Sequence, residues 1–257
     1  KKTESVDVMD ALGSAIRVDS RGPAVLRVLP RLNEEINEEW ISDKTRYAVD
    51  GLSRQRLDQP FVRKDGRLQP ATWAQAFELI TAKVKAASGE RIGVIAGDVQ
   101  DVESMAAAKD LFTALGSANI DCRQDGMVLG GGPRESWLMN STIAGIEDAD
   151  VVLLVGTNPR VEAPVFNARL RKRWLAGALR VGVIGEQADL TYKYDYLGAG
   201  AATLAGLSRA KSDFVKALKE AKKPAIIVGA GALSRDDGQA VLAAAAAVAK
   251  SFGMTWN

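Results

Sequence analysis

The stretch "VVLLVGTNPRVEAPVFNARLRKRW", Val151 to Trp174, decides how this chain folds. The run VVLLVG is short, apolar and rich in β-branched residues, which predicts a buried strand. A helix is expected to follow from Glu162 to about Ala176. In α/β proteins, a loop between such a strand and helix commonly holds a cofactor phosphate or a substrate. The loop here consists of Gly156, Thr157, Asn158 and Pro159.

The same alternation of short apolar runs and helical segments continues through most of the chain. Strands are expected at RIGVIAG, ANIDC, LRVGVIG and PAIIVGAGA, with helices between them. This pattern predicts an α/β fold with a doubly wound, mainly parallel sheet and helices on both faces. Residues 64–257 are expected to form this domain. The closing letters GMTWN read as the opening of another strand, so we expect the domain to be incomplete at its C-terminus.

Residues 1–63 have a different pattern. The segment AIRVDSRGPAVLRVLP alternates apolar and polar residues around Arg21-Gly22-Pro23, which predicts a β-hairpin. An acidic segment, NEEINEEW, and a short helix in SDKTRYAVDGL follow. We therefore expect a small β-rich N-terminal lobe that packs on the α/β domain, with its mobility greatest near residue 1.

Composition excludes several classes of chemistry. The chain has 257 residues, a net charge of +2, no histidine and a single cysteine, Cys122. Without histidine there is no Ser-His-Asp or Cys-His nucleophile system and no His-ligated zinc or haem. One thiol cannot form a disulfide or hold an iron–sulfur cluster by itself. The near-balanced charge does not call for a nucleic-acid partner, and the longest apolar run, Ala240 to Ala249, is too short to span a bilayer.

Glycine motifs give only weak evidence for a ligand. Gly229-Ala230-Gly231 follows a predicted strand, but Ser234 stands where a dinucleotide fingerprint needs its third glycine. A bound dinucleotide and a simple turn into the next helix both remain open, with the turn favoured. The run Gly130 to Pro133 lies in an irregular, glycine-rich region, and it either approaches a ligand closely or serves as a flexible connection.

The charged and thiol side chains also allow two interpretations each, one structural and one functional. The helix after the opening loop carries a basic cluster, for which a solvated face is the default and a partner contact the alternative. Cys122 is expected to be a buried, inert thiol rather than a metal ligand. Glu162 and Glu186 lie just beyond strand ends, but nothing pairs them as a general acid and base. The basic cluster consists of Arg169, Arg171, Lys172 and Arg173.

Several long blocks resemble one family. They are "WISDKTRYAVDGLSRQRLDQPFVR", "TIAGIEDADVVLLVGTNPRVEAPVFNARLRK", "ADLTYKYDYLG" and "KEAKKPAIIVGAGAL". They resemble the large iron–sulfur subunit of NADH:quinone oxidoreductase, respiratory complex I, of the mitochondrial and α-proteobacterial type. The resemblance implies a C-terminal region similar to molybdopterin-dependent oxidoreductases such as formate dehydrogenase. It also implies that the iron–sulfur clusters of the parent subunit lie in an N-terminal region outside this chain.

The chain departs from the catalytic relatives at the metal-binding positions. By the resemblance, the four cysteines of a [4Fe–4S] cluster would fall near Ser5, Val8, Leu12 and Ser42, and none of these is cysteine. The residue on molybdenum would follow ANIDCRQDG, where Cys122 comes too early and Gly126 has no side chain. Residues 1–63 are thus expected to be a degenerate iron–sulfur domain. Gly156, Thr157, Asn158 and Pro159 match the pterin-nucleotide loop of the family, as a vestige of that site.

The expected function follows from this resemblance. We expect a non-catalytic structural domain with no catalytic residue, metal or cofactor of its own, inactive alone, although its parent complex carries electrons from NADH to quinone and pumps protons. The expected partners are other peripheral-arm subunits, with no nucleic acid and no direct membrane insertion. The expected place is the cytoplasmic face of the bacterial inner membrane, or the matrix side of the mitochondrial one. Two alternatives are an active molybdopterin-dependent oxidoreductase fragment and the nucleotide-binding middle domain of a thiamine-diphosphate enzyme.

Overall fold

The computed structural model describes residues 1–97, 99–122, 126–127, 129 and 132–257. The chain divides into two compact units, Lys1–Val49 with Gly126–Asn257, and Asp50–Asp125. These units are defined by contacts between residues. The expected boundary at residue 63 instead marks a change in sequence pattern. That expected division stays a prediction.

A five-stranded sheet is the centre of the first unit, and all its neighbouring strands run parallel. The strand order is β10-β9-β8-β11-β12. The chain thus leaves β8 towards one edge of the sheet and later returns to the other side of β8. The strands are β8 (Val151–Val155), β9 (Arg180–Ile184), β10 (Asp195–Gly198), β11 (Pro224–Val228) and β12 (Thr255–Trp256).

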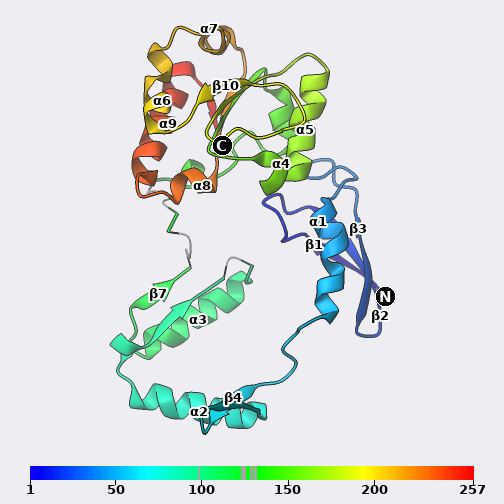
Figure 1. Cartoon of the computed structure of the whole chain (residues 1–257), viewed down its shortest axis with the longest axis vertical. Coiled ribbons are helices and arrows are strands. Elements are labelled where there is room, and N and C mark those ends of the chain that lie inside the picture. Colours follow the sequence, from blue (N-terminus) through cyan, green and yellow to red (C-terminus); the bar gives the residue numbers. More distant parts are fainter. Residues whose placement is uncertain (98, 123–125, 128, 130–131) are drawn as a thin grey trace. The chain divides into compact units, whose positions relative to one another are not determined.

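The central strand β8 is buried on both faces, as the apolar run predicts. Leu153 points into a core with residues of α6 (Ala201–Gly206), α7 (Asp213–Glu220) and α9 (Gly238–Phe252). Leu154 points to the opposite side, into a core with residues of α5 (Pro164–Leu175). Figure 1 shows α6, α7 and α9 on one side of the sheet and α5 on the other. Burial of each such side chain stabilises the fold by about 1.5–3 kcal/mol. The predicted parallel α/β fold is confirmed.

The N-terminal lobe is an antiparallel sheet of β1 (Lys2–Val6), β2 (Ala15–Arg21) and β3 (Ala24–Pro30). The predicted hairpin turns at Gly22, whose φ of 55° is one that glycine adopts without strain. Helix α1 (Asp43–Tyr47) follows and is capped by the Ser42 side chain. The lobe contacts the α/β part of its unit, since the Ala11 amide donates to the Glu162 carbonyl and Leu12 joins the core that contains Leu154.

The second unit has a hairpin, β4 (Phe61–Lys64) and β5 (Arg67–Pro70), and a short parallel pair, β6 (Gly93–Ile95) and β7 (Asn119–Asp121). Its helices are α2 (Trp73–Ala86) and α3 (Val102–Ala114), and neither contains a buried residue. Helix α2 begins with a capping box formed by Thr72 and Gln75. Within the described residues, β6 and β7 pair only with each other.

Some elements differ from the sequence-based expectation. The helix expected from Glu162 begins at Pro164, as α5, and a separate short helix, α4 (Pro159–Glu162), precedes it, because Ala163 leaves the helical region with φ −150° and ψ 71°. Strands β1, β5 and β10 and the short helix α8 (Ala230–Leu233) were not predicted. In the part of the chain that the structure describes, no helix has the length and apolar character needed to cross a bilayer.

Candidate functional site

A cleft of about 520 Å³ opens at the carboxyl ends of the parallel strands. It is lined by the loops after β8, β9 and β11, where strand order changes direction around β8. Open α/β sheets bind ligands at such switch points, because loops from neighbouring strands diverge there. The volume lies in the range of about 300–1,000 Å³ typical of small-molecule sites.

Close backbone approach between the loops gives the cleft its shape. Gly156 has φ +56°, and a methyl group added there would lie 2.5 Å from the Ala232 side chain. A methyl group on Gly229 would lie 2.5 Å from the Gly156 carbonyl oxygen. Glycine is therefore needed at Gly156 for both conformation and space, and at Gly229 for space alone, whether or not a ligand binds.

The predicted loop residues lie together, but the carboxylate of nearby Glu162 occupies hydrogen-bond donors of the loop. Thr157 and Asn158 line the cleft, whereas Pro159 is buried as the first residue of α4. The Glu162 carboxylate accepts from the backbone N–H of Asn158 at 2.6 Å and from the Thr157 hydroxyl at 3.0 Å. The loop's donors thus have a partner within the chain. Asn158 Oδ1, in contrast, is buried without a hydrogen-bond partner.

The remaining charged residues of the cleft are Glu186 and Arg235. Glu186 lies just after β9 and is exposed. Arg235 donates from Nε and Nη2 to the two carboxylate oxygens of Asp237, at 2.6 and 3.1 Å. Its charge is therefore already paired. The sequence places Glu162 and Glu186 just after strand ends, but it indicates no partner for either residue.

The glycine motif after β11 forms a turn. Gly229 precedes α8, and the Ser234 hydroxyl donates back to the Ala230 carbonyl at 3.0 Å. The other glycine run lies partly outside the described residues, since Gly130 and Gly131 are not among them.

The positions expected for cluster cysteines do not share one environment. Ser5 and Val8 are exposed, whereas Leu12 packs in a core cluster. Ser42 is buried, and its hydroxyl caps α1 and bonds Thr45 Oγ1 at 2.9 Å. Across the described residues, no group of three or more histidine, cysteine or acidic side chains is arranged to hold a metal ion.

Cys122 belongs to the second unit and is exposed, so the expectation of a buried thiol is wrong. The residue follows the short strand β7, whose side chains are exposed. The resemblance places a molybdenum ligand after ANIDCRQDG, and Gly126, which ends that segment, lies in the other unit.

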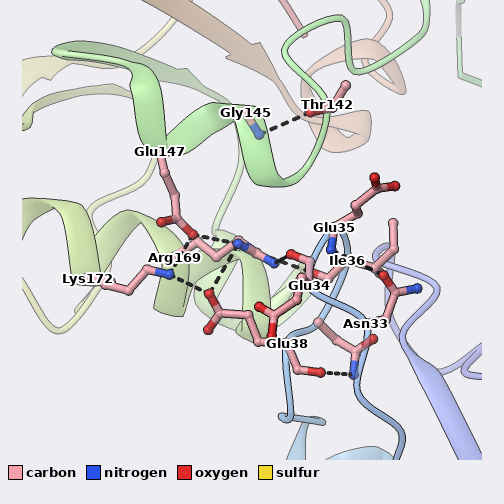
Figure 2. Close-up of polar contacts among 11 residues, drawn as sticks. Asn33, Glu34, Glu35, Ile36, Glu38, Thr142, Gly145, Glu147, Arg169 and Lys172 are labelled. Atoms are coloured by element: carbon pink, nitrogen blue, oxygen red, sulfur yellow. Dashed lines mark hydrogen bonds and ion pairs between the residues drawn. The ribbon is translucent and has the colours of Figure 1, made fainter.

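Arg169 is at the centre of a polar network that joins the lobe to α5, shown in Figure 2. Only 4% of its side chain is exposed. Its guanidinium donates to the carbonyls of Glu34 at 2.6 Å and Ile36 at 3.1 Å. It also donates to the Glu147 carboxylate at 2.5 Å. The prediction of a solvated basic face is therefore wrong for Arg169, although Arg171 is exposed.

Lys172 completes this network, which we call the Arg169 joint: Arg169, Lys172, Glu38, Glu147 and the Glu34 and Ile36 carbonyls. Lys172 pairs with Glu38 and with Glu147, the latter at 2.8 Å. Burial of Glu147 by itself raises its pKa, but hydrogen bonds from Lys172 and Arg169 outweigh burial and hold the pKa below its usual value. Burial lowers the pKa of Lys172, and bonds to Glu147 and Glu38 reverse that into a net rise.

Comparisons with known proteins agree with the fold. The model of the molybdopterin oxidoreductase family matches residues 56–257. A second model, NADH-ubiquinone oxidoreductase NDSU1/NuoG-like, 4Fe-4S domain, matches residues 1–50. Acetylene hydratase from Pelobacter acetylenicus has a similar structure, with a TM-score of 0.68 over 98% of this chain and 43% of that one. Its 12% identity supports a shared fold alone.

Curated relatives are much closer in sequence. The chain is 49% identical, over its whole length and 35% of the relative, to NADH dehydrogenase [ubiquinone] iron-sulfur protein 1, mitochondrial, of Solanum tuberosum. It is 48% identical, over 93% of its length and 33% of the relative, to the NADH-ubiquinone oxidoreductase 78 kDa subunit of Neurospora crassa. It is also 48% identical, over 94% of its length and 36% of the relative, to an NADH-quinone oxidoreductase subunit of Rickettsia felis.

The chain thus spans about a third of the length of these relatives. The resemblance to the large iron–sulfur subunit of NADH:quinone oxidoreductase is confirmed by this level of identity. The family match, which covers most of the sequence, also argues against the thiamine-diphosphate alternative. The strand-end cleft, the parallel sheet and the match over residues 56–257 place this chain in the molybdopterin oxidoreductase family.

Proposed function

We propose that this chain is a non-catalytic structural domain of the large iron–sulfur subunit of NADH:quinone oxidoreductase. In that role it supports electron transfer from NADH to quinone within the peripheral arm without carrying electrons itself. Its partners would be other peripheral-arm subunits, at the cytoplasmic face of the bacterial inner membrane or the matrix side of the mitochondrial one. The identity to three such subunits supports the assignment.

The observation that carries the non-catalytic role is the chemistry of residues 1–50. A 4Fe–4S model matches them, yet they contain neither cysteine nor histidine. Iron–sulfur clusters require thiolates, with histidine as the occasional replacement. Ser5, Val8, Leu12 and Ser42 do not supply such ligands, since none of them carries a thiol or an imidazole. The residues present do not fit a cluster.

The pterin loop does not fit its expected group either. A pterin nucleotide carries phosphates, which need free donors or cations. The Thr157 hydroxyl and the Asn158 amide both donate to Glu162, and the Arg235 guanidinium is engaged by Asp237. An incoming phosphate would face the Glu162 carboxylate at that place. We therefore regard Gly156, Thr157, Asn158 and Pro159 as a vestigial loop whose shape joins β8 to α4.

In place of chemistry, the chain offers a rigid frame. The Arg169 joint ties the acidic segment of the lobe to α5, and α5 packs on the central sheet. A lobe held in this way presents a fixed surface to neighbouring protein. This is the contribution that we assign to it within the parent subunit.

Metal analysis of the purified chain tests the proposal. We expect less than 0.1 iron and 0.1 molybdenum per chain by plasma mass spectrometry, roughly the background of adventitious binding, since no thiolate set is present. The Cys122→Ser variant is the control, because iron that disappears with it is held by an exposed thiol. Stoichiometric metal that survives this substitution would overturn the proposal and favour an active molybdopterin-dependent fragment.

Turnover is a second, independent test. The chain should reduce ferricyanide with NADH no faster than buffer, because it lacks a complete dinucleotide fingerprint and a cysteine set. Formate with a dye acceptor should likewise give no rate. A protein-dependent rate that scales with chain concentration in a clean preparation would contradict the non-catalytic role.

A further inference from the structure

We propose that a basic surface around helix α7 docks an acidic segment of a neighbouring protein, whose aspartate or glutamate side chains pair with its lysines. This goes beyond the proposed function, which names neighbouring subunits but no surface that receives them. Metal analysis tests the non-catalytic role, and a peptide-binding measurement tests the surface, so either can fail while the other stands.

Positive charge is concentrated in residues 209–223. This segment has six basic and two acidic residues, whereas the whole chain has a net charge of only +2. The rest of the chain is therefore net negative, and the two signs are segregated along the sequence. A cluster of one sign repels itself in an isolated protein and attracts a partner of the opposite charge.

Five of these six cations have no ionic partner in the part of the chain that the structure describes. All six are exposed, and Lys223 alone forms an ion pair there, with Asp148 at 2.9 Å. The hydrogen bonds that Arg180 donates to Asp195 raise the pKa of Arg180, and the nearby charge of Asp213 adds to that rise. Asp213 therefore also compensates a cation of β9. We call the five remaining cations the α7 basic surface: Arg209, Lys211, Lys216, Lys219 and Lys222.

The fold holds the α7 basic surface in place. One side of α7 packs into the core, where Phe214, Val215 and Leu218 are buried. Lys216 and Lys219 lie one turn apart on the outer side of the same helix. The lysine side chains thus extend from a fixed helix, and a partner does not have to order the backbone beneath them.

A depression of about 490 Å³ lies among three of the lysines, Lys211, Lys216 and Lys219. Ammonium groups are compact point charges on flexible stems, so each can turn towards a separate carboxylate. Acidic side chains that enter the depression would meet several cations at once. The surface therefore suits a short run of aspartate or glutamate residues.

Two other anionic partners fit this surface less well. A helix that binds at a membrane surface buries apolar side chains in the bilayer, but the large apolar residues of α7 already lie in the protein core. Proteins that bind single-stranded nucleic acid stack bases on aromatic side chains. Phe214, the one aromatic residue in the described segment 209–223, is buried.

Fluorescence anisotropy on the full 257-residue chain tests the proposal with a labelled peptide of ten glutamates. At about 50 mM salt the peptide should bind saturably, with a dissociation constant of roughly 100 μM or below. A peptide of ten glutamines should bind at least about tenfold more weakly, and about 300 mM salt should weaken the glutamate peptide to a similar extent, because exposed charges are screened. These comparisons use the unaltered protein, so they do not depend on the folding of a variant.

A double variant and a matched control locate the binding. Lys216→Ala with Lys219→Ala should weaken binding of the glutamate peptide about fivefold, since both charges are exposed and their loss leaves the core intact. Lys83→Ala with Lys85→Ala removes the same number of exposed charges from α2 and should change binding by less than about twofold.

Three results would overturn the proposal. The first is the absence of saturable binding to the glutamate peptide up to millimolar concentration. The second is an equal loss of affinity in the two double variants, which would indicate general charge attraction. The third is tighter binding to phosphatidylglycerol vesicles or to a ten-nucleotide single strand than to the peptide, which would assign the α7 basic surface to another class of partner.

Discussion

The Arg169 joint and the strand-end cleft are both built around glutamate side chains, and they use the charges in opposite ways. In the joint, Glu38 and Glu147 meet two cations, and the buried guanidinium has carbonyl partners as well. In the cleft, Glu162 accepts only from neutral donors, and no ion pair involves Glu186 among the residues that the structure describes. The joint's charges hold the lobe on α5, whereas the two carboxylates of the cleft are exposed to solvent.

This difference predicts where substitutions matter. A buried charge without its partners costs several kcal/mol, whereas an exposed carboxylate contributes little to stability. Changes in the joint should therefore affect the free energy of unfolding. Changes of charge in the cleft should leave stability nearly unchanged.

Arg169→Ala should have the largest effect. It leaves Glu147, Glu38 and two lobe carbonyls without their central donor, and we expect a loss of about 3–5 kcal/mol in the free energy of unfolding. Arg171→Ala is the matched control on the same helix, since that side chain is exposed, and it should cost at most about 0.5 kcal/mol. Urea unfolding followed by circular dichroism measures both. Equal midpoints for the two variants would contradict the structural role of the joint.

Gly156→Ala should come next, and it tests whether the cleft is held open by packing. The added methyl would lie 2.5 Å from the Ala232 side chain, at a φ of +56°. Left-handed strain of about 1–2 kcal/mol and overpacking of about 1–3 kcal/mol should add to a loss of roughly 2–5 kcal/mol.

Gly177→Ala separates these two contributions. Gly177 has φ +71° but open space around the added methyl, so it should show the strain alone, about 1–2 kcal/mol. Combining Gly156→Ala with Ala232→Gly should recover the overpacking part. If Gly156→Ala costs no more than Gly177→Ala, the close approach between the loops is not tight enough to shape the cleft.

Much of the fold could be predicted because its signals are local. The run Val151–Val155 is apolar at every position, which already indicates burial on both faces, and the capping box at Thr72 specifies a helix start from four residues. Strand β1 lacked such a signal. Its five residues are all exposed, and it is held by backbone pairing to β2, which leaves no apolar pattern to read.

The sites were harder to predict because their partners are distant in sequence. Arg169 resembles its basic neighbours on α5, but it contacts Glu34 and Ile36 more than 130 positions away. One signal was available: Arg169 lies three residues after Phe166, on the buried stripe of the helix, while an acidic segment elsewhere had no assigned partner. In the cleft the loop residues were found, but the pairing of Glu162 with its own loop depends on the break at Ala163, which no pattern indicated.

Glu147→Gln should have a smaller effect than the loss of Arg169, about 1–2 kcal/mol, because Glu38 still pairs with both cations. It should also reduce acid sensitivity. The folded pKa of Glu147 lies below its unfolded value, so its contribution is complete above that unfolded value, near pH 4.5, and is lost as pH falls through the folded pKa. Unfolding free energies measured from pH 6 to pH 3 should therefore fall less steeply for the variant. Parallel curves would show that Glu147 is not part of the acid response.

Glu162→Gln should have the smallest effect on stability, within about 0.5 kcal/mol, and it sharpens the contrast with Glu147→Gln most directly. Both substitutions remove one carboxylate charge and keep the shape of the side chain. In the joint that charge neutralises buried cations, whereas at Glu162 it meets only an amide and a hydroxyl, which an amide oxygen can also accept from. Thermal unfolding of the two variants separates the roles: an unchanged midpoint for Glu162→Gln fits an exposed charge with neutral partners, whereas a large loss would make Glu162 a structural residue like Glu147.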